Sequence, residues 1–170
     1  MQAALRKCPS SLALALTHTG AVLSFGKGTY GQLGHGDEVG QLEPKVIEVL
    51  RGKRVVAIAT GGWHSMVLTD EGTMLSFGLG RFGRLGHGDE VGQLVPKVID
   101  ALRGVRVVAI AAGLEHSMVL TDDGKVLSFG SNASETLLPL QSGVLGRDGP
   151  GRTPALILGV RVATASTAMW

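Results

Sequence analysis

The chain of 170 residues repeats itself with a period of 52 residues, and no other feature constrains its fold as strongly. Residues 21–72 and 73–124 align without a gap and match at 38 of 52 positions. The phrases LGHGDEVGQL, RVVAIA and HSMVLTD recur unchanged in the second copy. A period near 50 residues with glycine-rich turns is typical of a bladed propeller, in which each repeat supplies one four-stranded sheet.

Short apolar runs bounded by turn residues predict the strands of each repeat. Residues 54–59, 64–69 and 73–77 form such runs, and Asp70, Glu71 and Gly72 join the last two as a type I turn that ends in a glycine able to take positive φ. Residues 44–47 predict a fourth strand with Pro44 at its first position, where no ladder N–H is lost. We therefore expect an all-β fold made of propeller-type blades of four antiparallel strands.

Composition agrees with many tight turns. The chain has 26 glycines and only 6 prolines, without the three-residue period of collagen. Its apolar content of 44% is enough for one core, and an aromatic content of 4% requires that core to be mainly aliphatic.

The ends of the chain carry partial copies. Leu12 aligns with His64, so residues 1–20 are interpreted as a partial blade that supplies the closing strands of a preceding repeat, with a turn at residues 17–20. Residues 21–72 are repeat one, residues 73–124 are repeat two, and residues 125–170 are a divergent, truncated third repeat within one continuous structural domain. The third repeat recovers the repeat's landmarks at Leu145, Gly146, Pro154, Arg161 and Val162.

About three blade equivalents predict an incomplete ring, because closed propellers typically need about four to eight blades. Two interpretations follow. The chain is a fragment of a larger propeller, or two chains complete each other's split blades by head-to-tail self-association.

The segment GKGTYG (residues 26–31) imitates the glycine fingerprint of a dinucleotide-binding enzyme. That fingerprint requires a helix to follow, and the glycines at 34, 36 and 40 with Pro44 exclude one. The copy GLGRFG at residues 78–83 indicates a blade loop instead. An enzyme that uses this loop is therefore only a remote alternative.

Charge, cysteine content and hydropathy limit the partners and locations that the sequence implies. The net charge of +2 comes from short basic groups interleaved with acidic loops, so binding to chromatin is not implied by charge. The single cysteine, Cys8, cannot form an internal disulfide and fits a reducing compartment, and no apolar run is long enough to span a bilayer. We expect an intracellular location, cytoplasmic in preference to nuclear, with no membrane contact.

The repeat resembles that of the regulator of chromosome condensation family. The match in the first copy comprises Phe25-Gly26, Gly31-Gln32-Leu33-Gly34 with Gly36, Pro44, Val55, Ile58-Ala59, Gly61 and His64-Ser65, and it recurs 52 residues later except that Arg84 stands in place of Gln32. The resemblance implies protein partners: some members act as guanine nucleotide exchange factors for a small Ras-like GTPase and bind chromatin, and others are adaptor segments of larger proteins, including ubiquitin ligases.

The repeated histidines are interpreted as structural. His35 and His87 are symmetric copies on separate blades, whereas catalysis or metal binding needs different residues that converge on one point. His64 and His116 are expected to bond backbone atoms between strands or blades. No catalytic residue, metal site or cofactor is predicted.

Positions where the two repeats differ are the candidates for partner binding, because shared positions serve the scaffold. Arg, Tyr, Trp and Phe dominate interface energetics, although drift on exposed loops would also produce such differences. The candidates are Lys27, Thr29, Tyr30, Gln32, Trp63, Leu79, Arg81, Phe82, Arg84 and Glu115. The predicted function is a protein–protein interaction scaffold, with nucleotide exchange on a small GTPase as the alternative.

Overall fold

The computed structural model describes residues 11–131 and the strand at residues 155–157. These residues include both complete sequence repeats, 21–72 and 73–124. The predictions for Cys8 and for the landmarks Leu145, Gly146, Pro154, Arg161 and Val162 lie outside the described residues.

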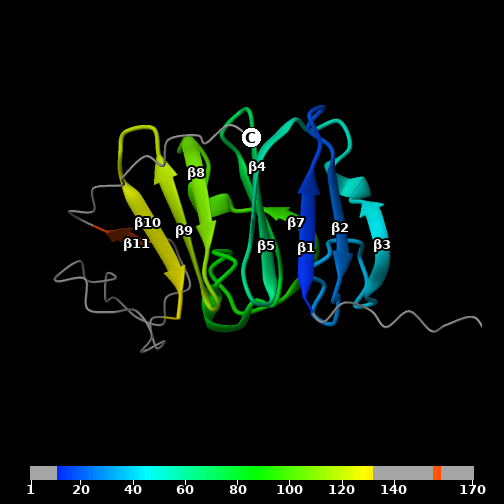
Figure 1. Cartoon of the computed structure of the whole chain (residues 1–170). Coiled ribbons are helices and arrows are strands. Elements are labelled where there is room, and N and C mark those ends of the chain that lie inside the picture. Colours follow the sequence, from blue (N-terminus) through cyan, green and yellow to red (C-terminus); the bar gives the residue numbers. More distant parts are fainter. Residues whose placement is uncertain (1–10, 132–154, 158–170) are drawn as a thin grey trace, which may run out of the picture.

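Three antiparallel sheets stand side by side (Figure 1). The first sheet has the order β1 (Leu12–Leu16), β2 (Val22–Gly26), β3 (Gln41–Val46). The second has the order β4 (Val55–Thr60), β5 (His64–Thr69), β6 (Met74–Gly78), β7 (Gln93–Val98). The third has the order β8 (Val107–Ala112), β9 (His116–Thr121), β10 (Val126–Gly130), β11 (Ala155–Ile157).

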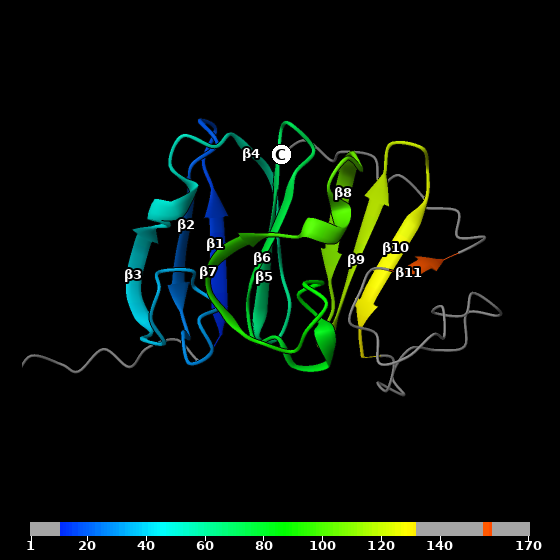
Figure 2. The same cartoon turned by 180° about the vertical axis from the view of Figure 1, so that it is seen from behind.

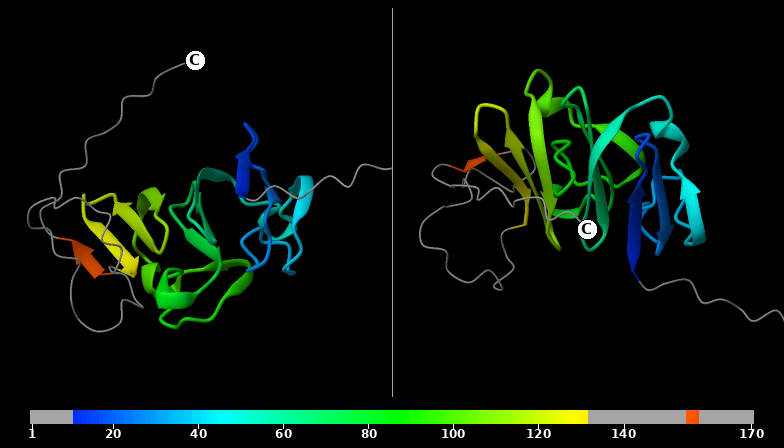
Figure 3. Two further views of the ribbon diagram at one scale, coloured as in Figure 1. Left: turned by 60° about the horizontal axis from the view of Figure 1, so that its bottom comes forward. Right: turned by 45° about the horizontal axis from the view of Figure 1, so that its top comes forward.

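The sheets follow a curved, open arc and do not close into a ring (Figure 3). Within residues 11–131, three short 3₁₀ helices lie in the connections, namely η1 (Glu48–Leu50), η2 (Arg81–Gly83) and η3 (Asp100–Leu102). The predicted all-β fold of propeller-type blades in an incomplete ring is confirmed.

Neighbouring sequence repeats interlock in the second sheet. Strands β4 and β5 come from residues 21–72, whereas β6 and β7 come from residues 73–124. The hairpin of β5 and β6 therefore crosses the repeat boundary, with His64 paired to Gly78 at its open end. Each complete sheet thus ties one repeat to the next.

The predicted hairpin turns are present. Gly72 donates its N–H to the carbonyl of Thr69 at 3.0 Å, and Gly72 and Gly124 have φ values of 81° and 82°. Such positive φ is easy for glycine because it has no Cβ. The turn at residues 17–20 forms in the same way, with φ of 85° at Gly20.

The predicted position of Pro44 is wrong. Strand β3 begins at Gln41, so Pro44 lies inside the strand and not at its start. Ser24 pairs with Lys45 while Gly26 pairs with Gln41, which places the proline in a bulge of the outermost strand. A strand can accept proline there because its missing N–H faces no ladder partner.

The hydrophobic core lies at the two junctions between sheets. One buried cluster joins the first and second sheets and consists of Val22, Ile47, Leu50, Val55, Val67, Leu75 and Phe77. The other joins the second and third sheets and consists of Met66, Leu68, Met74, Ile99, Leu102, Val107, Val119 and Phe129. All residues of β5 and β6 are buried, because the second sheet packs on a neighbour on either side.

The connections between strands lie on two opposite sides of the arc, at the upper and the lower ends of the strands in Figure 1. In Figure 1, β1 points upward and β2 downward, so the turn at residues 17–20 lies at the top and the loop at residues 27–40 at the bottom. The reverse view shows the equivalent loop of the second sheet, which contains η2, at the same lower end (Figure 2). No helix within residues 11–131 is long and apolar enough to cross a membrane.

Candidate interaction site

The glycine-rich loops fold as tight turns. Gly31 donates its N–H to the carbonyl of Gly28 at 2.9 Å, and Gly83 donates to Gly80 at the same distance. A Cβ at Gly28 would overlap the carbonyl oxygen of Val39, so the start of the loop packs closely against the end of the same loop. Within the described residues, the only helix at such a loop is the three-residue η2, which lies inside the loop and does not follow it, so a phosphate site of the dinucleotide type is not built.

Each loop is bonded to the sheet that follows it. Ser65 Oγ donates to the carbonyl of Gln32 at 2.8 Å, and Ser117 Oγ donates to the carbonyl of Arg84 at 2.7 Å. Gly36 also donates its N–H to the carbonyl of Leu94 at 3.0 Å. The loops therefore belong to the junctions between sheets and have little freedom to move independently.

The ten candidate residues fall into three groups by exposure. The exposed residues are Thr29, Tyr30 and Arg81, and the half-buried ones are Lys27, Trp63, Leu79, Phe82 and Glu115. Gln32 and Arg84 are fully buried, so the expectation that all ten lie on the surface does not hold for these two. Their influence on a partner has to pass through the residues that they contact.

Four candidates from three loops meet at the junction of the second and third sheets. The guanidinium of Arg84 lies 5.6 Å from the ring centroids of both Trp63 and Phe82. Its Nη2 lies 3.9 Å from a carboxylate oxygen of Glu115. A fifth candidate, Arg81, places its guanidinium 4.6 Å from the Phe82 ring. Cations over aromatic faces at these distances attract the ring electrostatically. We call these five residues the cation–aromatic cluster.

Backbone carbonyls fix Arg84 at the centre of the cluster. Its Nε donates to the carbonyl of Arg81 at 2.9 Å and its Nη1 to the carbonyl of Leu114 at 3.1 Å. Burial lowers the pKa of Arg84 and Glu115 raises it again. A guanidinium remains charged in proteins, so these bonds offset the cost of burying that charge.

The equivalent junction between the first and second sheets has different chemistry. Gln32 Oε1 accepts a hydrogen bond from the N–H of Tyr30 at 2.7 Å. Its Nε2 is buried and has no partner among the described residues. Lys27, Thr29 and Tyr30 belong to this loop and are not part of the cation–aromatic cluster.

His35 and His87 hold the loops onto their own sheets. His35 Nε2 lies 2.9 Å from Ser24 Oγ, and His87 Nε2 lies 3.1 Å from Ser76 Oγ. Burial, then Lys45 or Lys97 respectively, lowers the pKa of each imidazole. Within the part that the structure describes, no group of three or more His, Cys, Asp or Glu residues could hold a metal ion.

His64 bonds across the junction, as expected, but its partner is a side chain. His64 Nε2 lies 2.8 Å from Ser117 Oγ. Since Ser117 gives its own hydrogen to the Arg84 carbonyl, His64 must donate from Nε2, and the expected backbone partner is wrong. Ser117 is fully buried, so this Ser–His pair is structural.

Sequence reasoning missed two residues of this site. Ser117 connects His64 to the Arg84 loop, yet it is identical in both repeats and so gave no signal. Leu114 is 53% exposed and supplies a carbonyl to Arg84. Its replacement of Gly62 was visible as a difference between the repeats and could have identified it.

Both repeats of the chain match a known family. Residues 19–68 and 71–120 match the regulator of chromosome condensation (RCC1) repeat, and a second form of that repeat matches residues 55–84 and 107–134. These matches cover more than half of the chain and agree with the strands and turns described above.

Individual proteins with similar sequences or structures are much longer than this chain. The human E3 ubiquitin-protein ligase HERC2 is 48% identical over 119 residues, which is 69% of this chain and 2% of HERC2. The crystal structure of human WBSCR16 matches 89% of this chain with a TM-score of 0.72 and 26% identity, and 36% of that protein is covered. The structure of Prp20p from Saccharomyces cerevisiae, which was studied with its binding to Gsp1p and histones, has a TM-score of 0.66 and 27% identity over 89% of this chain and 38% of Prp20p.

Proposed function

Because the chain belongs to the RCC1 repeat family, we propose that it is a protein–protein interaction scaffold that binds its partner through the cation–aromatic cluster. One observation carries this proposal. Arg81, Phe82 and Trp63 lie around a buried arginine on the side of the arc that holds the glycine-rich loops. Arginine and large aromatic side chains are the types most enriched among binding hot spots.

The cluster has the physical properties of a preformed binding surface. Phe82 and Trp63 are half-buried and lie against Arg84, so binding would immobilise few additional rotamers. Arg81 and Leu114 are exposed beside them and offer one cationic and one apolar contact. An apolar centre with charge at its edge is the usual anatomy of a protein interface.

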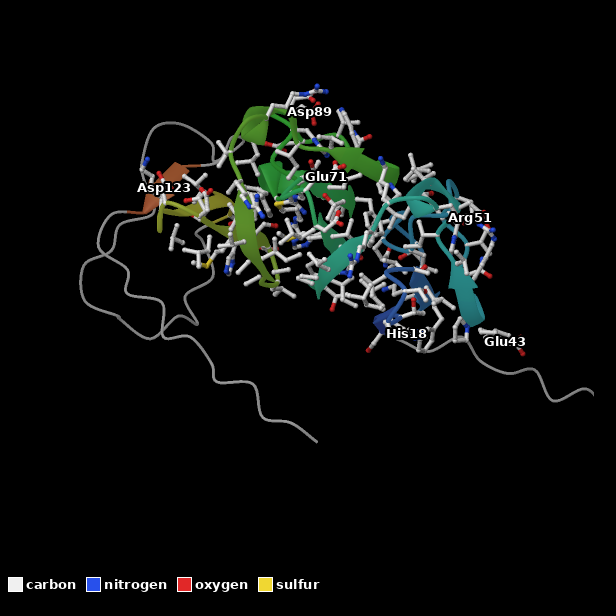
Figure 4. The ribbon with its side chains drawn as sticks, turned by 90° about the horizontal axis from the view of Figure 1, so that it is seen from above. His18, Glu43, Arg51, Glu71, Asp89 and Asp123 are labelled. Carbon is white, nitrogen blue, oxygen red and sulfur yellow. The ribbon has the colours of Figure 1, made fainter. Side chains whose placement is uncertain are left out.

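The opposite side of the arc, which holds the hairpin turns, is a weaker candidate for the partner-binding surface. Figure 4 looks onto that side and labels Arg51, Glu71 and Asp123, which come from three different connections. Arg51 pairs with Glu48, the equivalent Arg103 pairs with Asp100, and Lys125 pairs with Asp123, all of them exposed. Exposed ion pairs of this kind are well solvated and contribute little to binding.

The test removes one exposed and one half-buried side chain of the cluster and keeps its buried arginine. The double variant Arg81→Ala and Phe82→Ala should lose captured partners in quantitative mass spectrometry of an affinity pull-down, while its melting temperature stays within a few degrees of wild type. The control is Thr29→Ala and Tyr30→Ala, which changes the equivalent positions of the first loop. Equal capture by both variants would refute the assignment of the surface.

The second candidate function is guanine nucleotide exchange on a small Ras-like GTPase. It is favoured by the likeness to Prp20p, which was studied for binding to Gsp1p. Release of labelled nucleotide from a panel of purified Ras-like GTPases should accelerate if the chain carries this activity. A flat response across the panel would remove it.

We further propose that the chain works as one segment of a larger propeller or assembly and has no enzymatic activity of its own. The chain spans 2% of HERC2 and about a third of the solved structures that it resembles. The likeness to a ubiquitin ligase is confined to repeats, and function belongs to sites and not to folds. Ligase activity is therefore not transferred to this chain.

A further inference from the structure

The two glycine loops differ at one peptide unit. In the first loop, the N–H of Tyr30 points to the side-chain oxygen of Gln32. In the second loop, the carbonyl of Arg81 points to the side chain of Arg84. The Arg81 carbonyl and the Phe82 N–H belong to the same peptide unit, which is the one equivalent to Thr29–Tyr30. This unit therefore presents its N–H inward in one turn and its C=O inward in the other.

The residue at position 32 or 84 explains the difference. A glutamine side chain offers an oxygen that accepts, so it attracts an N–H, whereas a guanidinium only donates and attracts a carbonyl. Both side chains are fully buried in their junctions and cannot exchange these bonds for water. A buried donor therefore requires the opposite peptide orientation from a buried acceptor.

The backbone angles agree with this explanation. Both turns keep the bond from the fourth residue to the first, at 2.9 Å. Phe82, the third residue of the second turn, has φ of 63° and ψ of 13°, close to the values of a type II turn. Phe82 is the only non-glycine residue with positive φ in the described part of the chain, so Tyr30 does not share this conformation.

Positive φ at a bulky residue is unfavourable and requires compensation from the surroundings. Here the centroid of the Phe82 ring lies 4.6 Å from the guanidinium of Arg81 and 5.6 Å from that of Arg84. Arg84 thus acts twice, because it orients the peptide through Nε and faces the ring through its guanidinium. Tyr30 has no such cation contact among the described residues and is 40% exposed.

We infer that Arg84 is a positioning residue that selects the type II turn, and that by doing so it builds a surface for a partner segment carrying a carboxylate beside an apolar side chain. The second half of this inference rests on the proposed function, and the first half does not. The equivalent loop with Gln32 lacks the geometry and should not bind such a segment.

The chemistry of the partner follows from the charges that the cluster leaves available. Glu115, the acidic member of the cluster, faces Arg84. No ion pair within the described residues involves Arg81, whose exposed guanidinium remains open to an incoming carboxylate. Phe82, Trp63 and Leu114 lie around the same junction and supply apolar contact for the neighbouring side chain of the segment.

The structural half is tested by exchanging the two side chains. In Arg84→Gln, Phe82 should return to negative φ, which weakens its intraresidue amide-to-Hα NOE, and Arg84→Lys, which keeps a donor, should retain the strong NOE. Gln32→Arg should create a strong NOE at Tyr30 and serves as the test if Arg84→Gln does not fold. Unchanged NOEs at Phe82 in Arg84→Gln, or at Tyr30 in Gln32→Arg, would overturn the inference.

The binding half is tested with a phage-displayed library of random peptides. Selection on the wild-type chain should enrich peptides with Asp or Glu next to an apolar residue, and these should bind Arg84→Gln and Arg81→Ala about tenfold more weakly, which is 1.4 kcal/mol. Enriched peptides without a carboxylate would overturn the partner chemistry. If nothing is enriched while the turn still responds to Arg84→Gln, the proposed function fails and the positioning role stands.

Discussion

At residue 64 the chain buries a histidine where the equivalent position of the first sheet carries Leu12. Burial, with Arg84 and His116 nearby, lowers the pKa of His64 from 6.5 to about 3. Below pH 6.5, His64 therefore binds a proton in the unfolded chain but stays neutral in the folded protein. The stabilisation is complete above pH 6.5 and is lost as the pH falls toward the lowered pKa.

The first prediction concerns this pH dependence. Between pH 6.5 and 5, protonation of His64 in the unfolded chain should reduce the free energy of unfolding with a slope that rises from about 0.7 to about 1.4 kcal/mol per pH unit. Urea unfolding at several pH values should show this slope in the wild type and a smaller one in His64→Leu, which copies the residue found at position 12. His18→Leu, which removes an exposed histidine elsewhere in the chain, is the control variant. Equal slopes in wild type and His64→Leu would contradict the prediction.

Two glycines with positive φ differ in the space around them. A Cβ at Gly78, with φ of 108°, would lie 2.5 Å from the carbonyl oxygen of Trp63, whereas a Cβ at Gly104, with φ of 79°, would meet no atom within 4 Å. Gly104→Ala should therefore lower the free energy of unfolding by about 1 kcal/mol, because alanine disfavours the left-handed backbone conformation. Gly78→Ala should cost about 3 kcal/mol or more, because a backbone must also move. Chemical denaturation of both variants measures the difference, and equal losses would show that the packing argument is wrong.

At the scale of elements, one serine connects a strand of the third sheet to the loop before it and to the second sheet. Ser117 Oγ is hydrogen-bonded to both the Arg84 carbonyl and His64, while the equivalent Ser65 Oγ is hydrogen-bonded, among the described residues, to the Gln32 carbonyl alone. Ser117→Ala would leave two buried groups unpaired and Ser65→Ala one. Each such group costs about 1–3 kcal/mol, so we expect Ser117→Ala to be the more destabilising variant by at least about 1 kcal/mol. Equilibrium unfolding measures both losses, and a loss of stability in Ser65→Ala as large as that in Ser117→Ala would contradict this expectation.

The strands were predictable because their signals are local or repeated. Apolar runs between glycines, together with the 52-residue period, located β4, β5 and β6, and the Asp-Glu-Gly turn located their hairpin. The error at Pro44 arose because a bulge depends on the register with β2, which residues 41–46 do not specify on their own.

The site was less predictable because it is assembled between sheets. The differences between repeats made Arg81, Phe82, Trp63 and Arg84 candidates, but did not show that Arg84 is buried or that Phe82 has positive φ. Both depend on carbonyls and rings supplied from other loops, including that of Leu114, 30 residues away in sequence. The sequence shows that Arg84, a hydrogen-bond donor, replaces the equivalent Gln32. The effect of this replacement on the turn could be inferred only from the structure, because it depends on both side chains being buried between sheets.

At the scale of the whole molecule, the arc holds its core at two junctions that share the second sheet. Strands β5 and β6 are buried along their whole length, while every residue of β1 is at least partly accessible. Repeat architectures gain much of their stability from contacts between neighbouring units, so a unit with two neighbours opens less often than a unit with one. Stability should therefore be highest in the middle of the arc and lower in the first sheet.

The last prediction uses this gradient to examine self-association. Amide hydrogen exchange followed by mass spectrometry should show the slowest exchange in peptides that cover residues 64–78 and faster exchange in peptides that cover β1 and β2. If two copies associate head to tail, which is one of the two interpretations of the incomplete ring, exchange in β1 should slow as protein concentration rises, because a second chain then protects that sheet, while exchange in β5 and β6 should not change. Light scattering on the same samples gives the molar mass. A constant monomer mass with concentration-independent exchange in β1 would refute self-association, and slow exchange in β1 at every concentration would refute the gradient.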